Sequence, residues 1–440
     1  MLNIVVLNGG RGAATTIPPL LAMDGVNLTS VVNAYDDGKS TGEIRCFFGM
    51  LGPSDIRKVQ ELMLPESDAD YPANLHLFKY RFPLACKRSE ILRELAAFAN
   101  GLVPDLTGVR FTRANVQIAL QHFVKQFLHG LAMQEKVQGR QFNFSDCSIM
   151  NCIYAGAFLA FDRNIESAAR YMNRLFRLKG TVLPTSIENK KLMALRENGE
   201  VLYCEAEIVE LRSNARIERI YLLDQSPAPD LFEPLSLDEK RRYLESNHCF
   251  VGISEGVRRA LQQADIIIYA PGTQHSSLYP TYLSSGLASA IADNRTAVKV
   301  FVTNIGADYE TPDYKASDYI NGAFRYLSLS DQRRYQIQEF FDAVLINQNS
   351  AKADETRVVF DISSFADIPL RRIVDNFESD THPGKHDGKK VMQTVLDLYE
   401  EMTNLAWVFP CPDASAVSNT FPAEWLVGHD AACTPCLQGA

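Results

Sequence analysis

Two apolar runs near the N-terminus constrain the fold of this chain most, because each ends at once in a polar, glycine-bearing segment. Leu2–Leu7 is short and rich in β-branched residues, and it precedes Asn8–Thr16. Val26–Val32 is a second such run, and the loop Asn33–Arg45 leaves its carboxyl end. Open α/β sheets bind their ligands at the carboxyl ends of the strands. The two runs therefore predict two strands and a ligand site where they end.

The remaining sequence alternates short strands with helical stretches, as βαβ units of a parallel sheet do. Ala264–Tyr269 and Val298–Thr303 are two further expected strands, and amphipathic helices are expected at Glu90–Asn100 and Ala114–Gln134. This pattern predicts an α/β fold, doubly wound around a mainly parallel, Rossmann-like sheet with a helical insertion. The expected organisation is an α/β domain over residues 1–405, a helical insertion within it over about 65–145, and a C-terminal tail over 406–440.

The chain has 440 residues, of which 46% are hydrophobic and 22% are charged, a composition that is ordinary for a globular protein with a full core. A formal net charge of −9 argues against a general nucleic-acid partner, since phosphate backbones select basic surfaces. The sequence has no apolar run of membrane-spanning length, and its N-terminus is a strand instead of a signal peptide. We therefore expect a cytoplasmic protein that binds neither nucleic acid nor membrane.

Nine cysteines do not form a disulfide framework in a chain of this length. Most of them lie within apolar patterns, where a reduced and buried thiol is expected. Cys433 and Cys436 form a single C-x-x-C pair near the C-terminus, which supplies half of a zinc site. We interpret the pair as an incidental feature of the tail, with a redox or metal pair as the alternative.

The first glycine-bearing segment predicts a phosphate site. Gly9, Gly10 and Gly12 let the backbone turn sharply and bring bare N–H groups close to an anion. The helix expected at Ile17–Met23 adds a partial positive charge at its start. The segment has Thr15 in place of the third glycine of the dinucleotide fingerprint, so the motif alone is weak.

The second segment carries paired carboxylates, Asp36 and Asp37, directly before Gly38–Thr41. Gly38–Thr41 matches the end of a P-loop, but Asn33 replaces the first glycine of that motif and two carboxylates in the cradle would repel phosphate. Paired acids beside a phosphate loop suit Mg²⁺, which shares its shell with substrate oxygens. One acid could instead hold a ribose hydroxyl, and Asp37 could merely cap a turn. We expect Asp36 and Asp37 to bind Mg²⁺.

A third strand-end loop, Gly272–Tyr279, is rich in hydroxyl and amide donors. Gly272 permits close approach of the backbone to a ligand. Thr273 and Ser277 can cap the following helix as well as touch a ligand. We interpret His275 as an ordinary surface or pocket histidine, because the sequence assigns it no acid partner.

Several short motifs follow one another in a fixed order over roughly residues 1–400, and together they resemble the 2-phospho-L-lactate transferase family. Within that family, Ala270–Thr273 is closer to the bacterial branch known as the gluconeogenesis factor. The family's helix start is reduced at Asp146–Asn151 to a serine-like position and Asn151. The matching motifs are Asn8–Gly12, Asp36–Arg45, Pro53–Arg57, Val182–Thr185, Ala270–Gly272 with Ser277–Tyr279, Glu310–Thr311 with Ala316–Asp318, and His386–Lys390.

The resemblance implies a doubly wound α/β fold with its ligand at the carboxyl ends of the strands. In the transferase branch, a guanosine-diphosphate-linked lactate donates phospholactate to a deazaflavin alcohol with the help of Mg²⁺. The other branch binds a uridine-diphosphate sugar. By position, the resemblance assigns Gly10 and Gly12 to the diphosphate, Asp36 and Asp37 to the cation or acceptor, and Asn151 and the Gly272 loop to the nucleotide.

We therefore expect a nucleotide-diphosphate-binding protein whose ligand is a nucleotide or nucleotide sugar, and we leave a homodimer open. The alternative is a Mg²⁺-dependent enzyme that moves a phosphoester group from a nucleoside-diphosphate donor to an acceptor alcohol, with Lys39 or Arg45 offsetting charge on the leaving diphosphate. The expected catalytic residues are Asp36, Asp37 and Lys39, and the expected ligand-binding residues are Asn8, Gly9, Gly10, Arg11, Gly12, Ser40, Thr41, Arg45, Asp55, Arg57, Asn151, Pro271, Gly272, Thr273 and Ser277.

Overall fold

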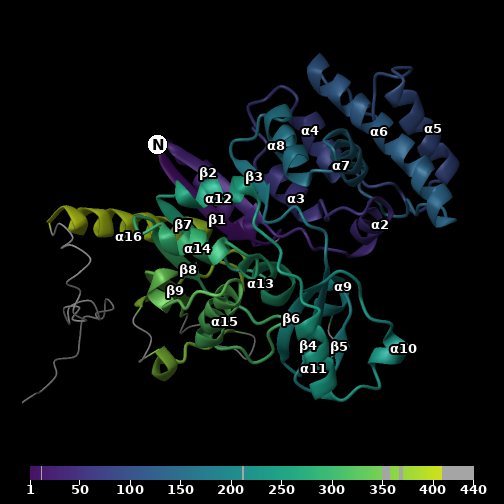
Figure 1. The fold of residues 1–440 in the computed structure, drawn as a ribbon. Helices are drawn as coiled ribbons and strands as arrows, with labels where there is room; N and C mark the ends of the chain where they lie inside the picture. Colours follow the sequence, from purple (N-terminus) through teal and green to yellow (C-terminus); the bar gives the residue numbers. More distant parts are fainter. Residues whose placement is uncertain (11, 211–212, 349–356, 366–369, 409–440) are drawn as a thin grey trace, which may run out of the picture.

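Within the residues that the computed structural model describes, which are 1–10, 12–210, 213–348, 357–365 and 370–408, a seven-stranded parallel sheet forms the centre of the protein (Figure 1). In the order in which they pair, its strands are β10 (Arg371–Asp375), β9 (Ala343–Asn347), β8 (Val298–Val302), β7 (Ile266–Tyr269), β1 (Leu2–Asn8), β2 (Val26–Val32) and β3 (Thr181–Pro184).

The strand order reverses direction between β1 and β7. Leu7 pairs with Val31 of β2 on one side and with Tyr269 of β7 on the other, so the carboxyl ends of these three strands lie side by side. The strands β2 and β3 continue to one side of β1, and β7 to β10 continue to the other. Such a reversal is the switch point of a doubly wound sheet, where a crevice opens for a ligand. The predicted α/β fold is confirmed.

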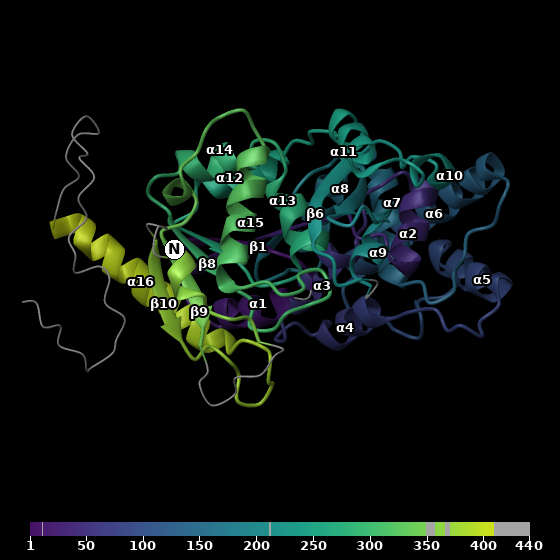
Figure 2. The ribbon, with the colours of Figure 1, turned by 90° about the horizontal axis from the view of Figure 1, so that it is seen from below.

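Helices cover both faces of the sheet (Figure 2). One face carries α1 and α16, which pack against each other, and the other carries α12, α14 and α15. β7 has all four side chains buried, as a strand covered on both faces requires. No described helix is long and apolar enough to cross a membrane. The bounds of these helices are α1 (Ala13–Leu21), α12 (Glu255–Gln262), α14 (Leu287–Asp293), α15 (Ala316–Leu329) and α16 (Gly388–Val408).

The chain between β2 and β3 is helical and lies to one side of the sheet in Figure 1. The apolar stripe predicted along α6, from Val116 to Leu131, is buried. α6 crosses α7 closely, because a Cβ atom on Gly156 would lie 1.8 Å from the carbonyl oxygen of Phe123. The helices of this part are α2 (Lys39–Phe48), α3 (Ser54–Leu62), α4 (Tyr71–Lys79), α5 (Arg88–Ala99), α6 (Ala114–Gln138), α7 (Ile149–Ala160) and α8 (Ile165–Leu175).

A three-stranded antiparallel sheet in the described part of the chain, ordered β5-β4-β6, lies against the segment that follows β7, because α9 contacts η1 and β6 contacts α13. Its strands alternate between two cores, since Leu222 packs into the main core and the next residue, Leu223, packs into a second, smaller one. The elements here are β4 (Lys191–Arg196), β5 (Val201–Leu202), β6 (Ile217–Leu223), α9 (Glu205–Ile208), α10 (Pro229–Phe232), α11 (Leu237–Ser246), η1 (Gln274–Leu278) and α13 (Tyr279–Tyr282).

Two predicted loops are wrong in their second halves. The segment Gly272–Tyr279 is a loop only as far as Thr273, because the π-helical turn η1 begins at Gln274 and α13 at Tyr279. The segment Asn33–Arg45 is a loop only as far as Gly38, and α2 begins at Lys39. The Asp36 carboxylate accepts a hydrogen bond from the N–H of Gly38 at 3.0 Å, which closes a side-chain turn and ends the loop early. The backbone of Lys39–Arg45 therefore has helical geometry, and the side chains of Ser40–Arg45 are spread around a helix.

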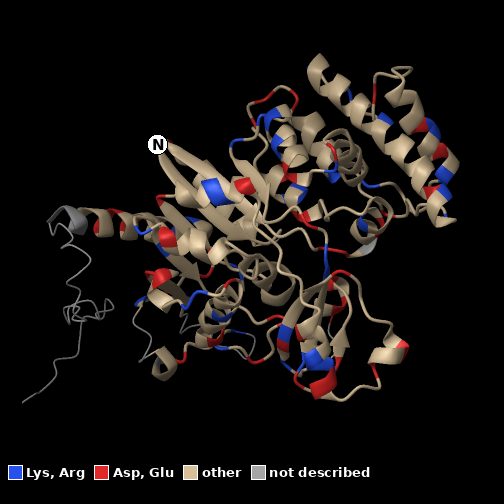
Figure 3. Cartoon of the chain, viewed as in Figure 1, with Lys and Arg blue, Asp and Glu red and all other residues tan. Residues whose placement is uncertain are grey.

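The helix expected at Ile17–Met23 begins earlier than predicted, at Ala13. Short 3-10 turns occur at Ile337–Glu339 and Ile362–Phe365. Charged residues of both signs are interspersed along the outer helices and loops (Figure 3). Some of the predicted features, namely Arg11, the side chain of Lys39, and Cys433 and Cys436 in the tail, lie outside the described residues.

Candidate functional site

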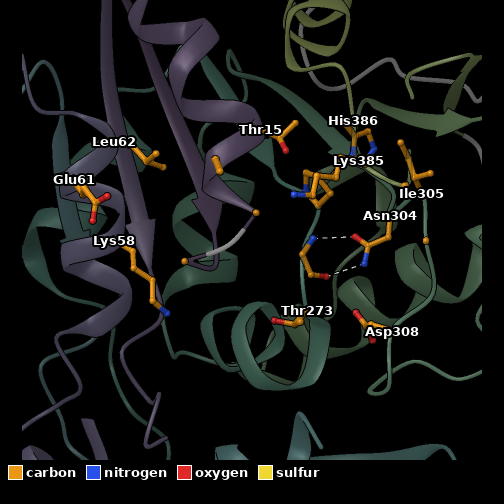
Figure 4. A pocket seen from close by; sticks show the side chains of 17 residues that line it. Thr15, Lys58, Glu61, Leu62, Thr273, Asn304, Ile305, Asp308, Lys385 and His386 are labelled. Carbon is orange, nitrogen blue, oxygen red and sulfur yellow. Dashed lines mark hydrogen bonds between the residues drawn. The ribbon is translucent and has the colours of Figure 1, made fainter. Parts of the chain in front are cut away.

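A cavity of ≈ 680 Å³ lies at the switch point of the sheet (Figure 4). The segments that follow β1, β7 and β8 form its walls, together with α3 and the segment before α16. Its volume falls in the usual range of small-molecule sites, and its place is where doubly wound sheets bind their ligands. The residues that line it are Gly10, Gly12, Ala14, Thr15, Lys58, Glu61, Leu62, Pro271, Gly272, Thr273, Asn304, Ile305, Gly306, Asp308, Gly384, Lys385 and His386.

The loop that follows β1 and carries Gly9, Gly10 and Gly12 (the β1 loop) needs its glycines for close packing against its neighbours at the cavity wall. A Cβ atom on Gly12 would lie 2.0 Å from the carbonyl oxygen of Pro271, and one on Gly10 would lie 2.3 Å from Oδ1 of Asp55. The N–H of Gly10 also donates to Oδ2 of Asp55 at 3.3 Å. The structure thus brings these four predicted residues together, and any side chain at Gly10 or Gly12 would push the loops apart.

Two lysines and the start of α1 bring positive charge to the cavity, whose lining also includes the carboxyl groups of Glu61 and Asp308. α1 begins at the wall with Gly12 and Ala14, and its first turn has neither a side-chain cap nor an acidic residue. The amines of Lys58 and Lys385 point into the cavity from opposite sides (Figure 4). Lys58 also lies 2.8 Å from Oδ1 of Asp55. A helix start without a side-chain cap, lying between two lysines, is a favourable environment for a phosphate group. Neither lysine was predicted from the sequence.

The β7 loop is held by a residue that the sequence analysis did not single out, Asn304. Its Oδ1 accepts from the N–H of Gly272 at 2.9 Å, and its Nδ2 donates to the carbonyl oxygen of the same residue at 3.0 Å (Figure 4). Within the loop, Oγ1 of Thr273 donates to Oγ of Ser277 at 2.9 Å. Asn304 directly follows the strand expected at Val298–Thr303. Its place at the carboxyl end of that strand is the sequence feature from which a role at the site could have been predicted.

The Asp36 loop does not line this cavity. Asp36 accepts a hydrogen bond from Oγ1 of Thr41 at 3.4 Å, in addition to the one from the Gly38 N–H. Asp37 accepts from the N–H of Ala206 at 3.3 Å and lies 3.9 Å from NH1 of Arg45. Asp37 therefore ties the β2 loop to α9 of the small sheet. Asp36 is influenced by the charge of Asp55, whose carboxylate accepts from the N–H of Gly10 at the cavity wall.

Four carboxyl groups interact beside the cavity. Burial, reinforced by the Asp55 carboxylate, raises the pKa of Asp36. Burial, together with Asp36 and Asp37, raises the pKa of Glu205 to about 8. Glu205 was not predicted from the sequence, because it lies on α9, far along the chain from the Asp36 loop that it faces. In the described part of the protein, no group of three or more His, Cys, Asp and Glu side chains is arranged to hold a metal ion by itself.

Arg45 does not line the cavity. It binds the backbone of the loop after β2 (Asn33–Gly38, the β2 loop). It is 3% exposed, and its NH1 donates to the carbonyl oxygen of Tyr35 at 2.6 Å. Its NH2 donates to Oδ1 of Asn189 at 2.8 Å and to the carbonyl oxygen of Lys190 at 2.6 Å. These contacts join the loop to the start of the small sheet, and they occupy both terminal nitrogens of the guanidinium group.

A buried polar network lies beneath the same loop. Asn151 is fully buried, and its Nδ2 lies 3.4 Å from both Oγ of Ser40 and Oγ of Ser54. Its Oδ1 accepts from Nε of Arg57 at 3.2 Å. The hydroxyl groups of Thr41 and Ser54 share a further hydrogen bond. The predicted residues Ser40, Thr41, Arg57 and Asn151 therefore meet in one cluster that joins the starts of α2, α3 and α7.

Two histidines near the loops are neutral at pH 7. Burial lowers the pKa of His275 to about 3, and the ring packs edge-on against Tyr279 with centroids 4.9 Å apart. His275 is therefore a core residue and not a surface one. Burial also lowers the pKa of His386, which lines the cavity, to about 4.

The first of the predicted ligand residues, Asn8, is buried and accepts a hydrogen bond from the Ser30 hydroxyl at 2.6 Å.

Comparison with known proteins shows the family and the fold of the chain. A gluconeogenesis factor from Listeria monocytogenes is 24% identical over 411 residues, which cover 91% of this chain and 97% of that protein. Another from Halalkalibacterium halodurans is 22% identical over 399 residues and covers 90% of this chain and 96% of its own length. A crystal structure of a UPF0052-family protein from Bacillus halodurans has the same fold, with a TM-score of 0.61 at 19% identity over 90% of this chain and 100% of that one. The family model described as 2-phospho-L-lactate transferase CofD matches residues 4–377, and the chain belongs to that family.

Proposed function

We propose that the protein binds a nucleoside-diphosphate ligand of the nucleotide-sugar type in the cavity between β1, β7 and β8. The observation that carries the proposal is the pairing of an uncapped α1 start with the amines of Lys58 and Lys385, which point inward from opposite walls. The diphosphate would lie against the N–H groups of α1, between the two lysines. Membership of the family described as 2-phospho-L-lactate transferase CofD supports a nucleotide-type ligand.

A calorimetric titration tests this proposal directly. Uridine-diphosphate glucose, uridine diphosphate and free glucose are titrated separately into the full chain. We expect heat and thermal stabilisation with the first two ligands, because both carry the diphosphate, and neither effect with glucose. An absence of heat and of stabilisation with guanosine and uridine diphosphates and their sugars would overturn the proposal.

A second candidate is the Mg²⁺-dependent transfer of a phosphoester group to an acceptor alcohol. The acids beside the cavity favour it, because the Asp55 carboxylate adds to the cost of ionising Asp36 and a cation would relieve that repulsion. Carboxylate oxygens are the ligands that Mg²⁺ prefers, with the rest of its shell taken from water and substrate. The ion would offset charge on the leaving diphosphate. Incubation with guanosine-linked phospholactate, a deazaflavin acceptor and Mg²⁺ tests for turnover by product analysis.

Variants of the paired acids separate their roles. Asp36→Asn should remove the part of nucleotide affinity that depends on Mg²⁺ and leave the Mg²⁺-independent part unchanged. Asp37→Asn should act differently, since its carboxylate is engaged by the N–H of Ala206 and lies near Arg45. We expect it to loosen the contact with α9 and lower the thermal midpoint. Equal Mg²⁺ dependence in the wild type and in Asp36→Asn would rule out a metal role for Asp36.

A further inference from the structure

Glu310 is a buried carboxyl group in the segment between β8 and α15, with 1% of its surface exposed. It accepts hydrogen bonds from the N–H groups of His275 at 2.8 Å and Ser276 at 2.9 Å, and a third from the Ser276 hydroxyl. All three donors belong to η1, the turn that follows Thr273 at the cavity wall. Burial of a carboxyl group is costly unless its hydrogen bonds are made, so this contact fixes η1 in one position.

Glu310 is itself held firmly. Oδ1 of Asp308 accepts from the N–H of Glu310 at 3.0 Å and from the Thr311 hydroxyl at 2.8 Å. The Thr311 hydroxyl also lies 3.0 Å from the hydroxyl of Tyr319 on α15. The backbone at Glu310 is therefore anchored to α15, a long helix on one face of the sheet. This contact fixes the backbone position from which the Glu310 carboxyl group extends.

The π-helical turn η1 also contacts the β1 and β2 loops of the site. The carbonyl oxygen of Ser276 accepts from Nδ2 of Asn33, at the start of the β2 loop, at 2.9 Å. A Cβ atom on Gly9 would lie 2.7 Å from Cβ of Ser277, so the β1 loop packs tightly against η1. A shift of Ser277 toward Gly9 would therefore displace the β1 loop. A displacement of η1 is therefore passed on to both loops by direct contact.

We infer that Glu310 is the positioning residue of the ligand site, which holds the β1, β2 and β7 loops in the mutual arrangement that the ligand requires. Glu310 is not among the residues that line the cavity, so it acts through η1 and not by touching the ligand. The inference deepens the proposed function and relies on it for the identity of the ligand. The mechanical part, from Glu310 to Gly9, stands on the contacts of the free protein.

Two substitutions distinguish positioning from simple stability. In Glu310→Gln, the amide oxygen can accept from the two N–H groups and the amide nitrogen can donate to the Ser276 hydroxyl, so all three contacts are kept. In Glu310→Ala, both N–H groups and the hydroxyl lose their partner. Asp70→Ala is the matched control, because Asp70 is equally buried and accepts from the N–H and hydroxyl of Thr112 at 2.7 and 2.6 Å, within the helical part of the chain.

Amide hydrogen exchange of the free protein gives the first readout. Glu310→Ala should speed exchange at least about tenfold in η1 and also at Gly9 and Gly10, which Glu310 does not touch, whereas Glu310→Gln and Asp70→Ala should leave both segments unchanged. Faster exchange in η1 alone would overturn the relay to the β1 loop. This outcome does not depend on whether any nucleotide binds.

Titration with uridine-diphosphate glucose gives the second readout, at a temperature where every variant is folded. Glu310→Ala should raise the dissociation constant by at least about tenfold, and Glu310→Gln should restore it to within about threefold of the wild type. Asp70→Ala should lower the thermal midpoint with no change in affinity. A Glu310→Ala protein with wild-type affinity would refute the positioning role, whereas a wild type that binds no nucleotide would refute the proposed function instead.

Discussion

Lys385 is the residue through which the segment before α16 contributes charge to the cavity. We expect Lys385→Ala to weaken binding of a nucleoside diphosphate about tenfold, equivalent to about 1.4 kcal/mol, because one charge-assisted contact to the diphosphate is lost. Lys390→Ala is the matched control, since Lys390 is exposed on α16 and does not line the cavity. Calorimetry of both variants decides the point, and equal affinities would contradict the assignment of Lys385 to the phosphate.

Glu310 also makes stability depend on pH. Burial raises its pKa to about 8, although its hydrogen bonds favour the charged form, whereas a free glutamate titrates at about 4.3. Between these values the native state holds a proton that the unfolded chain has lost. The contribution is therefore complete below the lower value and is lost as the pH rises through 8. Glu310→Gln cannot titrate, so its thermal midpoint should exceed that of the wild type by more at pH 9 than at pH 5. A constant difference across that range would refute the raised pKa.

At the scale of elements, the site depends on how closely the β1 loop meets the β7 loop. A methyl group at Gly12 would overlap the Pro271 carbonyl oxygen, which is main chain and cannot rotate away. We expect Gly12→Ala to lower the thermal midpoint and to weaken nucleotide binding by more than about tenfold, the loss of roughly one charge-assisted contact. Gly252→Ala is the control, because a Cβ atom there has no atom within 4 Å. Unchanged affinity in Gly12→Ala would show that the loops can separate freely.

At the scale of the whole molecule, the described residues form two hydrophobic cores that share the three-stranded antiparallel sheet. Leu222 and Leu223 are neighbours on β6, but the first packs into the main core and the second into the smaller core. Replacing either by alanine should cost about 2–5 kcal/mol of cavity and transfer energy. We expect Leu223→Ala to speed amide exchange in β4, β6 and α11 while β1 and β7 stay protected, and Leu222→Ala to reduce protection in β1 as well. Identical exchange patterns would mean that the two cores unfold as one.

The elements that the sequence predicted well are those whose signal is local. The strands β1, β2, β7 and β8 are short apolar runs that end in polar loops, and the stripe along α6 is a repeat of three and four residues, so neither needs information from distant segments. The boundaries of helices and loops were predicted less accurately where two local sequence rules compete. At Asp36–Lys39, a side-chain turn and a helix start meet within four residues, and the helix takes over earlier than the loop pattern suggested.

The α/β fold and the starts of the three strand-end loops follow from local sequence, because strand, turn and helix patterns depend on neighbouring residues. The roles of those loops depend on tertiary contacts instead. The β1 and β7 loops line the cavity and the Asp36 loop does not, whereas Lys58 and Lys385 reach the cavity from other elements. Glu310 belongs to a short motif in the sequence, but its hydrogen bonds to η1 arise only when distant segments pack together. A lysine or a glutamate acquires such a role from the chain segments that pack against it, so its neighbours in the sequence do not reveal that role.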